Sequence, residues 1–217
     1  MTDESTKAHV VAELEWEPSV HAEHIGVTVR DGVVTLSGHV ASYFEKFAAN
    51  RAVMRVSGAK AIAEELTIRF PDSKTDGVSD EDIAHRALSL LSWNVAVPDT
   101  VKVKVEKGLV NLSGTVDWFY QRAAAEADMR KLQGVTGVLN SIGVKPACIH
   151  SDDVAGKIKA ALERNADLEA AKIDVTASGS TITLAGKVAN ATSRSVAEKT
   201  AWSAPGVMQV EDLLTIA

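Results

Sequence analysis

The stretch DGVVTLSG at residues 31–38 decides the fold, because two closely similar stretches follow it in the chain. KGLVNLSG occupies residues 107–114 and GSTITLAG occupies residues 179–186, so their closing glycines lie 76 and 72 residues apart. A second glycine follows each stretch 20 residues later: Gly58, Gly134 and Gly206. Anchors that keep one order and spacing indicate an internal repeat, and we therefore expect three small domains rather than one large one.

Around each stretch, segments with apolar residues at helical spacing and segments with alternating apolar residues follow one another in the same order. In the second copy, Ser79 and three acidic residues precede apolar positions at helical spacing, which predicts a first helix. Alternating valines at 101–105 predict a strand, and the turn Lys107-Gly108 predicts a hairpin into a second strand. A second helix and a last strand follow. Each copy is thus expected to fold as αββαβ, with two helices on one face of a three-stranded mixed sheet, in an α+β protein.

We place the three domains at residues 1–70, 77–146 and 150–217. The polar linker at 71–77 is expected to be flexible, whereas the short linker at 146–150 should restrict the geometry between the second and third domains. Domains of about 65–70 residues have thin cores and are marginal alone. We therefore expect the copies to stabilise one another by covering open sheet faces or edge strands.

Single residues also have expected backbone roles. The glycine inside the second strand of each copy, such as Gly38, predicts a bulge or a close backbone approach, which we expect to come from a helix. Residues 42–45 (SYFE) predict a capped start of the second helix. The equivalent caps are Asp117 in the second copy and either Asn190 or Thr192 in the third. The second glycine of each copy is expected to mark the end of this helix.

These motifs resemble the BON domain, named for bacterial OsmY and nodulation proteins. The resemblance rests on Trp-x-Pro-x-Val at residues 16–20, the glycine-bounded hairpin, the capped helix, and the glycine with its trailing strand. The second copy matches most fully, with GLVNLSGTVDWFYQR and LQGVTGVLNSIGV, and the third lacks the Trp and the aromatic cluster. The resemblance covers nearly the whole chain. It implies αββαβ units of osmotic-stress and envelope proteins, phospholipid- or membrane-binding roles, chaperone-like roles for the OsmY type, and no catalytic motif.

The charge distribution limits the possible partners. The net charge is −6, which argues against bulk binding to nucleic acid or to anionic lipid, since both repel a negative surface. Residues 1–72 carry −4, residues 73–149 are neutral and residues 150–217 carry −2. The sequence has no apolar run of about 20 residues. Its acidic start is not a secretory signal, so a cytoplasmic location is expected as written, or a periplasmic one if a signal was removed.

Aromatic residues cluster at the start of the second helix. Tyr43 and Phe44 lie there in the first copy, and Trp118, Phe119 and Tyr120 lie there in the second. Successive helical residues point about 100° apart, so at least one of the latter three should lie outside its own domain core. Two interpretations stay open: a contact site for lipid headgroups or a partner, or packing between repeats.

Lys102 and Lys104 alternate with valines on the first strand of the second copy. Period two places both lysines on one sheet face, which is either a basic binding face or an ordinary solvated face. Trp16 and Trp93 end the first helices of two copies, and we expect them to be core or lid residues.

No enzyme signature is present in the sequence. His21 and His24, with neighbouring glutamates, offer too few fixed ligands for a metal site. Cys148 and His150 lie in a linker without a third group to orient them, so we interpret the thiol as a bystander. We therefore expect no catalytic residues, metal or cofactor.

The sequence predicts a non-enzymatic, stress-associated binding protein. The preferred partner is a phospholipid membrane surface or a membrane-linked or unfolded protein, contacted mainly by the second copy. The alternative is a cytoplasmic scaffold that self-associates as a homo-oligomer or docks a protein, without lipid binding.

Overall fold

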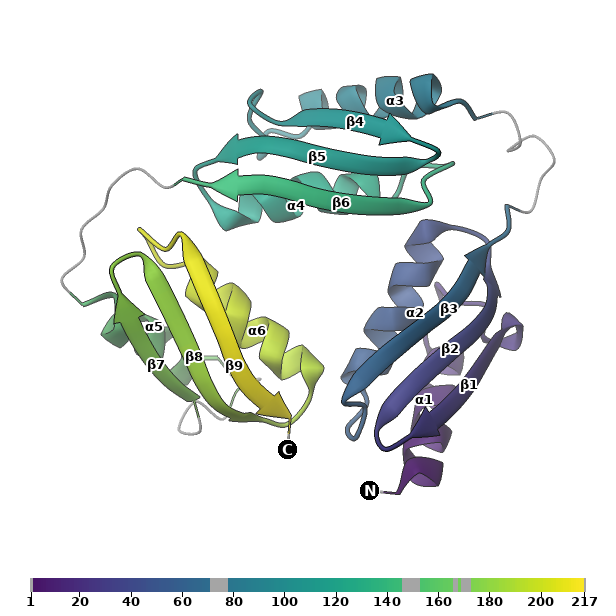
Figure 1. The fold of residues 1–217 in the computed structure, drawn as a ribbon, viewed down its shortest axis with the longest axis horizontal. Coiled ribbons are helices and arrows are strands. Elements are labelled where there is room, and N and C mark those ends of the chain that lie inside the picture. The colour runs from purple at the N-terminus through teal and green to yellow at the C-terminus, as the bar shows by residue number, and fades with distance from the viewer. Residues whose placement is uncertain (1, 71–77, 146–152, 166–167, 169–172, 217) are drawn as a thin grey trace.

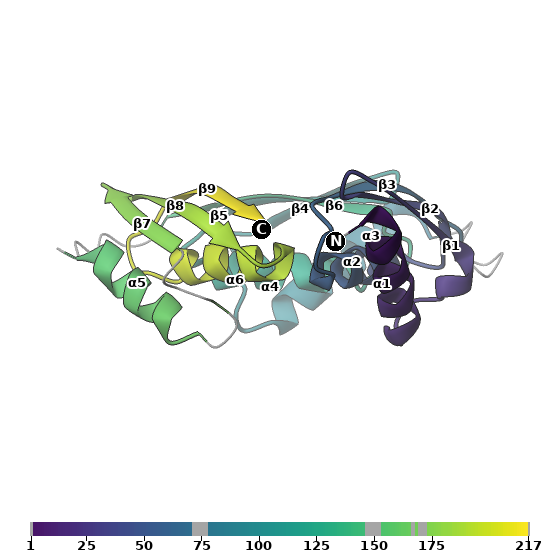
Figure 2. The ribbon, with the colours of Figure 1, turned by 90° about the horizontal axis from the view of Figure 1, so that it is seen from below.

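The computed structural model describes residues 2–70, 78–145, 153–165, 168 and 173–216. Its three domains form a triangular array, and in each domain the strands lie on the same side of the molecule, with the helices behind them (Figures 1 and 2). Both predicted linkers fall largely outside the described residues, as do Cys148 and His150.

Each domain has the predicted order of elements. Domain 1 contains α1 (Asp3–Trp16), the short 3-10 helix η1 (Ala22–His24), β1 (Ile25–Arg30), β2 (Val33–Val40), α2 (Tyr43–Arg55) and β3 (Ala61–Ile68). Domain 2 contains α3 (Asp80–Trp93), β4 (Lys102–Glu106), β5 (Leu109–Val116), α4 (Phe119–Met129) and β6 (Gly137–Val144). Domain 3 contains α5 (Val154–Glu163), β7 (Ile173–Ser178), β8 (Thr181–Val188), α6 (Ala191–Trp202) and β9 (Gln209–Ile216).

All three sheets have the same topology and register. The strand orders are β1-β2-β3, β4-β5-β6 and β7-β8-β9. The first pair in each sheet is antiparallel and the second is parallel. The glycine inside the middle strand pairs with an equivalent residue each time: Gly38 with Leu66, Gly114 with Ile142 and Gly186 with Leu214. The α+β fold class and the mixed three-stranded sheets are therefore confirmed.

The hairpin turn is fastened to the first helix. Asp31 and Gly32 have φ values of 52° and 80°, the left-handed conformation that a tight type I′ turn requires. The carboxylate of Asp3, at the start of α1, accepts their backbone N–H groups at 2.8 and 3.1 Å. Asp80 accepts the N–H groups of the turn at 107–108 in the same way, at 2.7 and 2.9 Å. One aspartate per domain thus joins helix and hairpin in domains 1 and 2.

The strand glycines are required by a close backbone approach, although a helix does not make it. Gly38 has φ 120°, and a Cβ placed there would lie 2.1 Å from the carbonyl oxygen of His24. At Gly114 the corresponding distance is 2.2 Å, to the oxygen of Thr100. The chain crosses these glycines as it enters the first strand, because each glycine pairs at or beside that strand's first residue. The expectation of an approaching helix is wrong.

Most predicted helix caps are confirmed. Ser42 Oγ accepts the N–H of Glu45, and Asn190 Oδ1 accepts the N–H of Ser193. Asp117 is not the cap of α4, which begins one residue later, after Trp118. The side-chain oxygen of Gln121 accepts the backbone N–H groups of Asp117 and Trp118, both at 3.0 Å. A side chain from within the helix thus satisfies N–H groups at its start.

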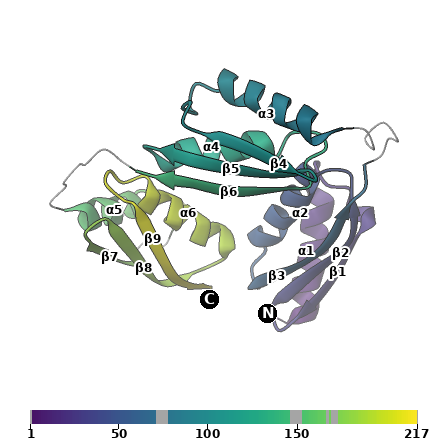
Figure 3. The same cartoon turned by 45° about the horizontal axis from the view of Figure 1, so that its top comes forward.

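Each domain has a separate core between its sheet and its two helices. The residues at its centre are fully buried and equivalent: Val34 and Leu36, Val110 and Leu112, Ile182 and Leu184. The open sheet faces stay uncovered, and the domains meet through helices α2, α4 and α6 in the middle of the array (Figures 1 and 3). The expectation that the copies cover one another's open faces is therefore wrong, since the faces all turn to one side.

Candidate functional site

Three junctions between domains are built from equivalent positions. The start of each inner helix approaches the end of the inner helix of the next domain, and the last helix approaches the first (Figure 3). The positions at the helix ends are Met54, Arg130 and Trp202, which are spaced by 76 and 72 residues like the repeat itself. The contacts therefore run head to tail around the array.

Domain 1 meets domain 2 through aromatic rings. The guanidinium of Arg130 lies 3.7 Å from the ring centre of Phe47, a cation–π contact. Tyr43 packs against the core of domain 2. Domain 2 meets domain 3 at an aromatic stack in which the rings of Phe119 and Trp202 lie 5.1 Å apart at 13°.

The junction that closes the array between domains 3 and 1 is polar. The hydroxyl of Thr192 donates to the backbone oxygen of Met54 at 3.3 Å, where α6 lies beside α2. Ala191 stands where Tyr43 and Phe119 stand in the other domains. The same helix ends thus meet at all three junctions, with α6 lying closer to α2 than the other inner helices lie to one another. Among the described residues, the aromatic contacts occur at the other two junctions.

The structure divides the predicted aromatic site residues into two groups. Tyr43 and Phe119 lie in junctions. Phe44 and Tyr120 point to solvent, with exposed fractions of 44% and 59%, and Trp118 is half-buried beside the start of α4. The rings therefore do not form one continuous patch, and their role in binding lipid or a partner stays a prediction.

Lys102 and Lys104 are exposed on the open face of β4, as the period-two pattern predicts. Lys104 pairs with Glu106 of the same face at 3.0 Å, which neutralises part of the positive charge. A binding role for this face also stays a prediction.

Trp16 and Trp93 are not core residues. Their exposed fractions are 82% and 84%, the reverse of the expectation. Leu14 and Leu91 are the last buried residues of the two helices, and a tryptophan two positions later lies about 200° around the axis. Helical periodicity alone could therefore have placed both rings on the solvent side.

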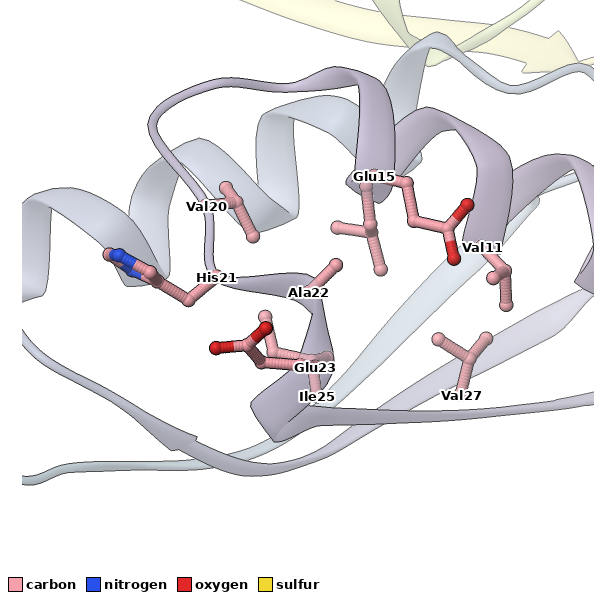
Figure 4. A pocket seen from close by; sticks show the side chains of 9 residues that line it. Val11, Glu15, Val20, His21, Ala22, Glu23, Ile25 and Val27 are labelled. Atoms are coloured by element: carbon pink, nitrogen blue, oxygen red, sulfur yellow. The ribbon is translucent and has the colours of Figure 1, made fainter.

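Domains 1 and 2 each contain a cleft of about 400 Å³ between the first helix and the segment that leads into the first strand. In domain 1 the apolar lining comes from Leu14, Ile25 and Val27, with Glu15 and Glu23 beside them (Figure 4). In domain 2 the equivalent lining residues are Leu91, Val101, Ser92 and Asp99, together with Leu88.

Beside the cleft of domain 1, a buried carboxylate holds the entering segment. Glu45 Oε1 accepts the backbone N–H of His21 at 2.8 Å and lies 2.9 Å from its ring Nδ1, and Oε2 accepts the N–H of Ala41 at 2.7 Å. Burial works to raise the pKa of Glu45, but these hydrogen bonds outweigh it and hold the pKa below its usual value. We refer to this arrangement of His21, Ala41 and Glu45 as the Glu45 clasp.

The histidines considered as metal ligands have other neighbours. His21 joins the Glu45 clasp, and the ring of His24 stacks on that of His39 at 4.6 Å. Within the described residues, no three His, Cys, Asp or Glu side chains gather as metal ligands would. In the same part of the chain, no helix is both long and apolar enough to span a membrane.

Comparison with known proteins shows what the chain is similar to. The osmotically-inducible protein Y of Escherichia coli (strain K12) is 31% identical over 148 residues, which are 67% of this chain and 74% of that protein. Among solved structures, the C-terminal domain of CdsD, a structural protein of the type III secretion system of Chlamydia trachomatis, matches at 16% identity with a TM-score of 0.28 and full coverage of both chains. The PrgH periplasmic domain matches at 11% identity and a TM-score of 0.24, over 89% of this chain and 95% of that one. Scores this low carry no argument about arrangement.

The family comparison covers almost the entire chain. The BON domain matches at residues 2–69, 79–146 and 150–217, one match for each αββαβ unit. The chain therefore belongs to the BON domain family, as a tandem array of three copies related to an osmotically inducible protein.

Proposed function

We propose that this protein is a non-enzymatic, stress-associated binding protein that engages phospholipid membrane surfaces through domain 2. The BON family is not a known enzyme family, and the relative with 31% identity is named for osmotic induction. The proposal depends on one observation, the exposed apolar end of α3.

Four large apolar side chains are exposed at this end of α3 and in the segment after it: Leu88, Leu90, Trp93 and Val95. Leu90 and Trp93 are three positions apart, so they lie on one side of the helix. We call these four residues the α3 edge. Leu88 lies about 200° around the helix from Leu90 and lines the cleft of domain 2, so Leu90 and Trp93 are the pair that can enter a surface together. Tryptophan suits the boundary between lipid headgroups and acyl chains.

The charge of the domains supports the choice of domain 2. Residues 73–149 are neutral, whereas residues 1–72 carry −4. In domain 1 the position of Leu90 is taken by Glu13, so Trp16 lacks the apolar neighbour that Trp93 has. Lys102, Lys104 and Tyr120 are further predicted contacts in domain 2.

Vesicle flotation at low salt tests the proposal. Vesicles of phosphatidylcholine, with and without phosphatidylglycerol, should carry the protein upward. Replacing Leu90 and Trp93 with Gln should reduce flotation about tenfold, because each substitution removes apolar area from the contact. Both side chains are exposed, so the melting temperature should stay unchanged. The matched control is Trp16→Gln, which should float like the unmodified protein.

Two further arms complete the test. A Phe44→Ser and Tyr120→Ser protein shows whether the exposed aromatics of the second helices contribute. No flotation on either vesicle would overturn the lipid proposal. A defined oligomer in light scattering that L90Q/W93Q dissociates would instead favour the self-associating scaffold.

A further inference from the structure

The cleft of domain 1 combines an apolar lining with two exposed carboxylates. Glu15 projects from α1 and Glu23 from η1, on either side of the opening (Figure 4). On the same helix, Glu13 and Glu17 pair with Arg55 at 2.7 and 3.0 Å. Within the described part of the chain, neither Glu15 nor Glu23 pairs with a lysine or arginine, and Glu23 Oε1 lies 3.7 Å from Nε2 of its neighbour His24. Both carboxylates are exposed, so a cationic partner can reach them.

The carboxylate pair is not a requirement of the fold. The equivalent cleft of domain 2 has Ser92 in the place of Glu15 and Asp99 in the place of Glu23, and it keeps the apolar lining. In contrast, the aspartate that binds the hairpin turn is present in both domains, as Asp3 in domain 1 and Asp80 in domain 2. Of these two clefts, only that of domain 1 thus has a second carboxylate, and residues 1–72 already carry a charge of −4.

We propose that this cleft binds a cationic apolar segment of a protein partner. One large apolar side chain of an extended peptide enters between Leu14, Ile25 and Val27, and its flanking Lys or Arg residues pair with Glu15 and Glu23. The volume of about 400 Å³ falls within the range of small-ligand sites. The apolar lining supplies affinity, and the two carboxylates select the charge of the segment.

This inference does not depend on the membrane contact proposed for domain 2. The carboxylates of domain 1 repel an anionic bilayer, so lipid and peptide have separate sites on one chain. Failure of vesicle flotation leaves the peptide site intact, and failure of peptide binding leaves the lipid proposal intact.

Fluorescence anisotropy on the full chain tests the inference. The probe is a labelled nine-residue peptide of alternating lysine and leucine, and its comparison is the same peptide with glutamate in place of lysine. At low salt the lysine peptide should bind at least tenfold more tightly than the glutamate peptide. Replacing Glu15 and Glu23 with Gln should weaken it about 3–10-fold, with less effect at high salt, because exposed ion pairs are screened.

A control variant that loses the same number of charges elsewhere distinguishes binding at the cleft from attraction by the overall negative charge of the protein. Glu4 and Glu65 are exposed and lie outside the lining, so E4Q/E65Q removes the same charge at other places. This protein should keep its affinity within about twofold. A gain-of-function variant, Ser92→Glu, gives domain 2 a carboxylate pair with Asp99 and should add a second lysine-peptide site per chain. Equal losses in E15Q/E23Q and E4Q/E65Q, or equal binding of both peptides, would overturn the proposal.

Discussion

The junction between domains 2 and 3 and the junction between domains 3 and 1 use equivalent positions for different contacts. In the first, Phe119 stacks on Trp202. In the second, Thr192 donates one hydrogen bond to the backbone of Met54. The repeat therefore fixes where neighbouring domains meet, and the side chains at those places fix how strongly they are held.

Head-to-tail contacts of this kind close only when the rotation between copies suits the number of copies. Here a third copy brings α6 back to α2, where the side chains of the described residues make one hydrogen bond and no aromatic stack. We expect domain 3 to detach from domain 1 more easily than from domain 2.

The largest effect is expected from Gly114→Ala. The new Cβ would meet the oxygen of Thr100 at 2.2 Å, at a residue with φ 119°. We expect a loss of about 3 kcal/mol or more in the free energy of unfolding of domain 2. Domain 2 takes part in both aromatic junctions, so urea unfolding followed by hydrogen exchange should show domain 3 losing protection as well.

Gly143→Ala is the matched control in the same sheet. Its Cβ would find its nearest neighbours at 3.8 Å, and its φ is not positive, so stability should change by less than about 0.5 kcal/mol. Unchanged protection of domain 3 in the Gly114→Ala protein would show that the aromatic junction does not couple the two domains.

The next effect concerns the acid sensitivity of domain 1. The pKa of Glu45 is lower in the folded protein than its ordinary value of 4.5, so its stabilisation is complete above that value. It is lost as the pH falls through the lowered folded pKa. Replacing Glu45 with Gln should cost about 1–3 kcal/mol at pH 7 and remove this acid-dependent loss.

Domain 2 provides an internal comparison for that measurement. Gln121 stands at the position of Glu45 and has no ionisable group. Hydrogen exchange between pH 3 and 7 should therefore show domain 1, and its junction with domain 2 at Tyr43 and Phe47, loosening in acid before the core of domain 2. Hydrogen bonds from Ser19 and Arg55 also lower the pKa of Glu17, so E45Q should keep a smaller dependence on pH. A pH dependence of domain 1 that E45Q leaves undiminished would assign the effect to another group.

The sequence predicted the fold of each domain better than it predicted the clefts and the junctions between domains. The order of elements, the mixed sheet and the hairpin turns follow from the spacing of the repeated motifs, and so does the close backbone approach at Gly38 and its equivalents. The clefts and junctions do not, since they depend on long-range proximity between side chains such as Arg130 and Phe47. Trp93 could have been predicted correctly. Its exposure follows from its helical spacing to Leu91, whereas its place at the end of the first helix led us to expect a core or lid residue.

The aromatic junction should show a moderate and separable energy. Phe119→Ala and Trp202→Ala are each expected to cost about 1–2 kcal/mol in the stability of domain 3, because both rings are partly buried against each other. A double-mutant cycle isolates the stack, and we expect a coupling energy of about 0.5–1.5 kcal/mol. A coupling energy of zero would mean that the rings stabilise only their own domains.

The smallest effect is expected at the closing junction. Thr192→Val removes one exposed hydrogen bond to Met54 and should change stability by less than about 0.5 kcal/mol. Installing the aromatic pair of the other junction, as Ala191→Phe with Met54→Trp, should instead hold domain 3 to domain 1 and narrow the distribution of distances between them. Spin labels on β1 and β7 measure that distribution. If T192V broadens it as much as Trp202→Ala does, the two junctions are equally strong and side-chain identity does not set their strength.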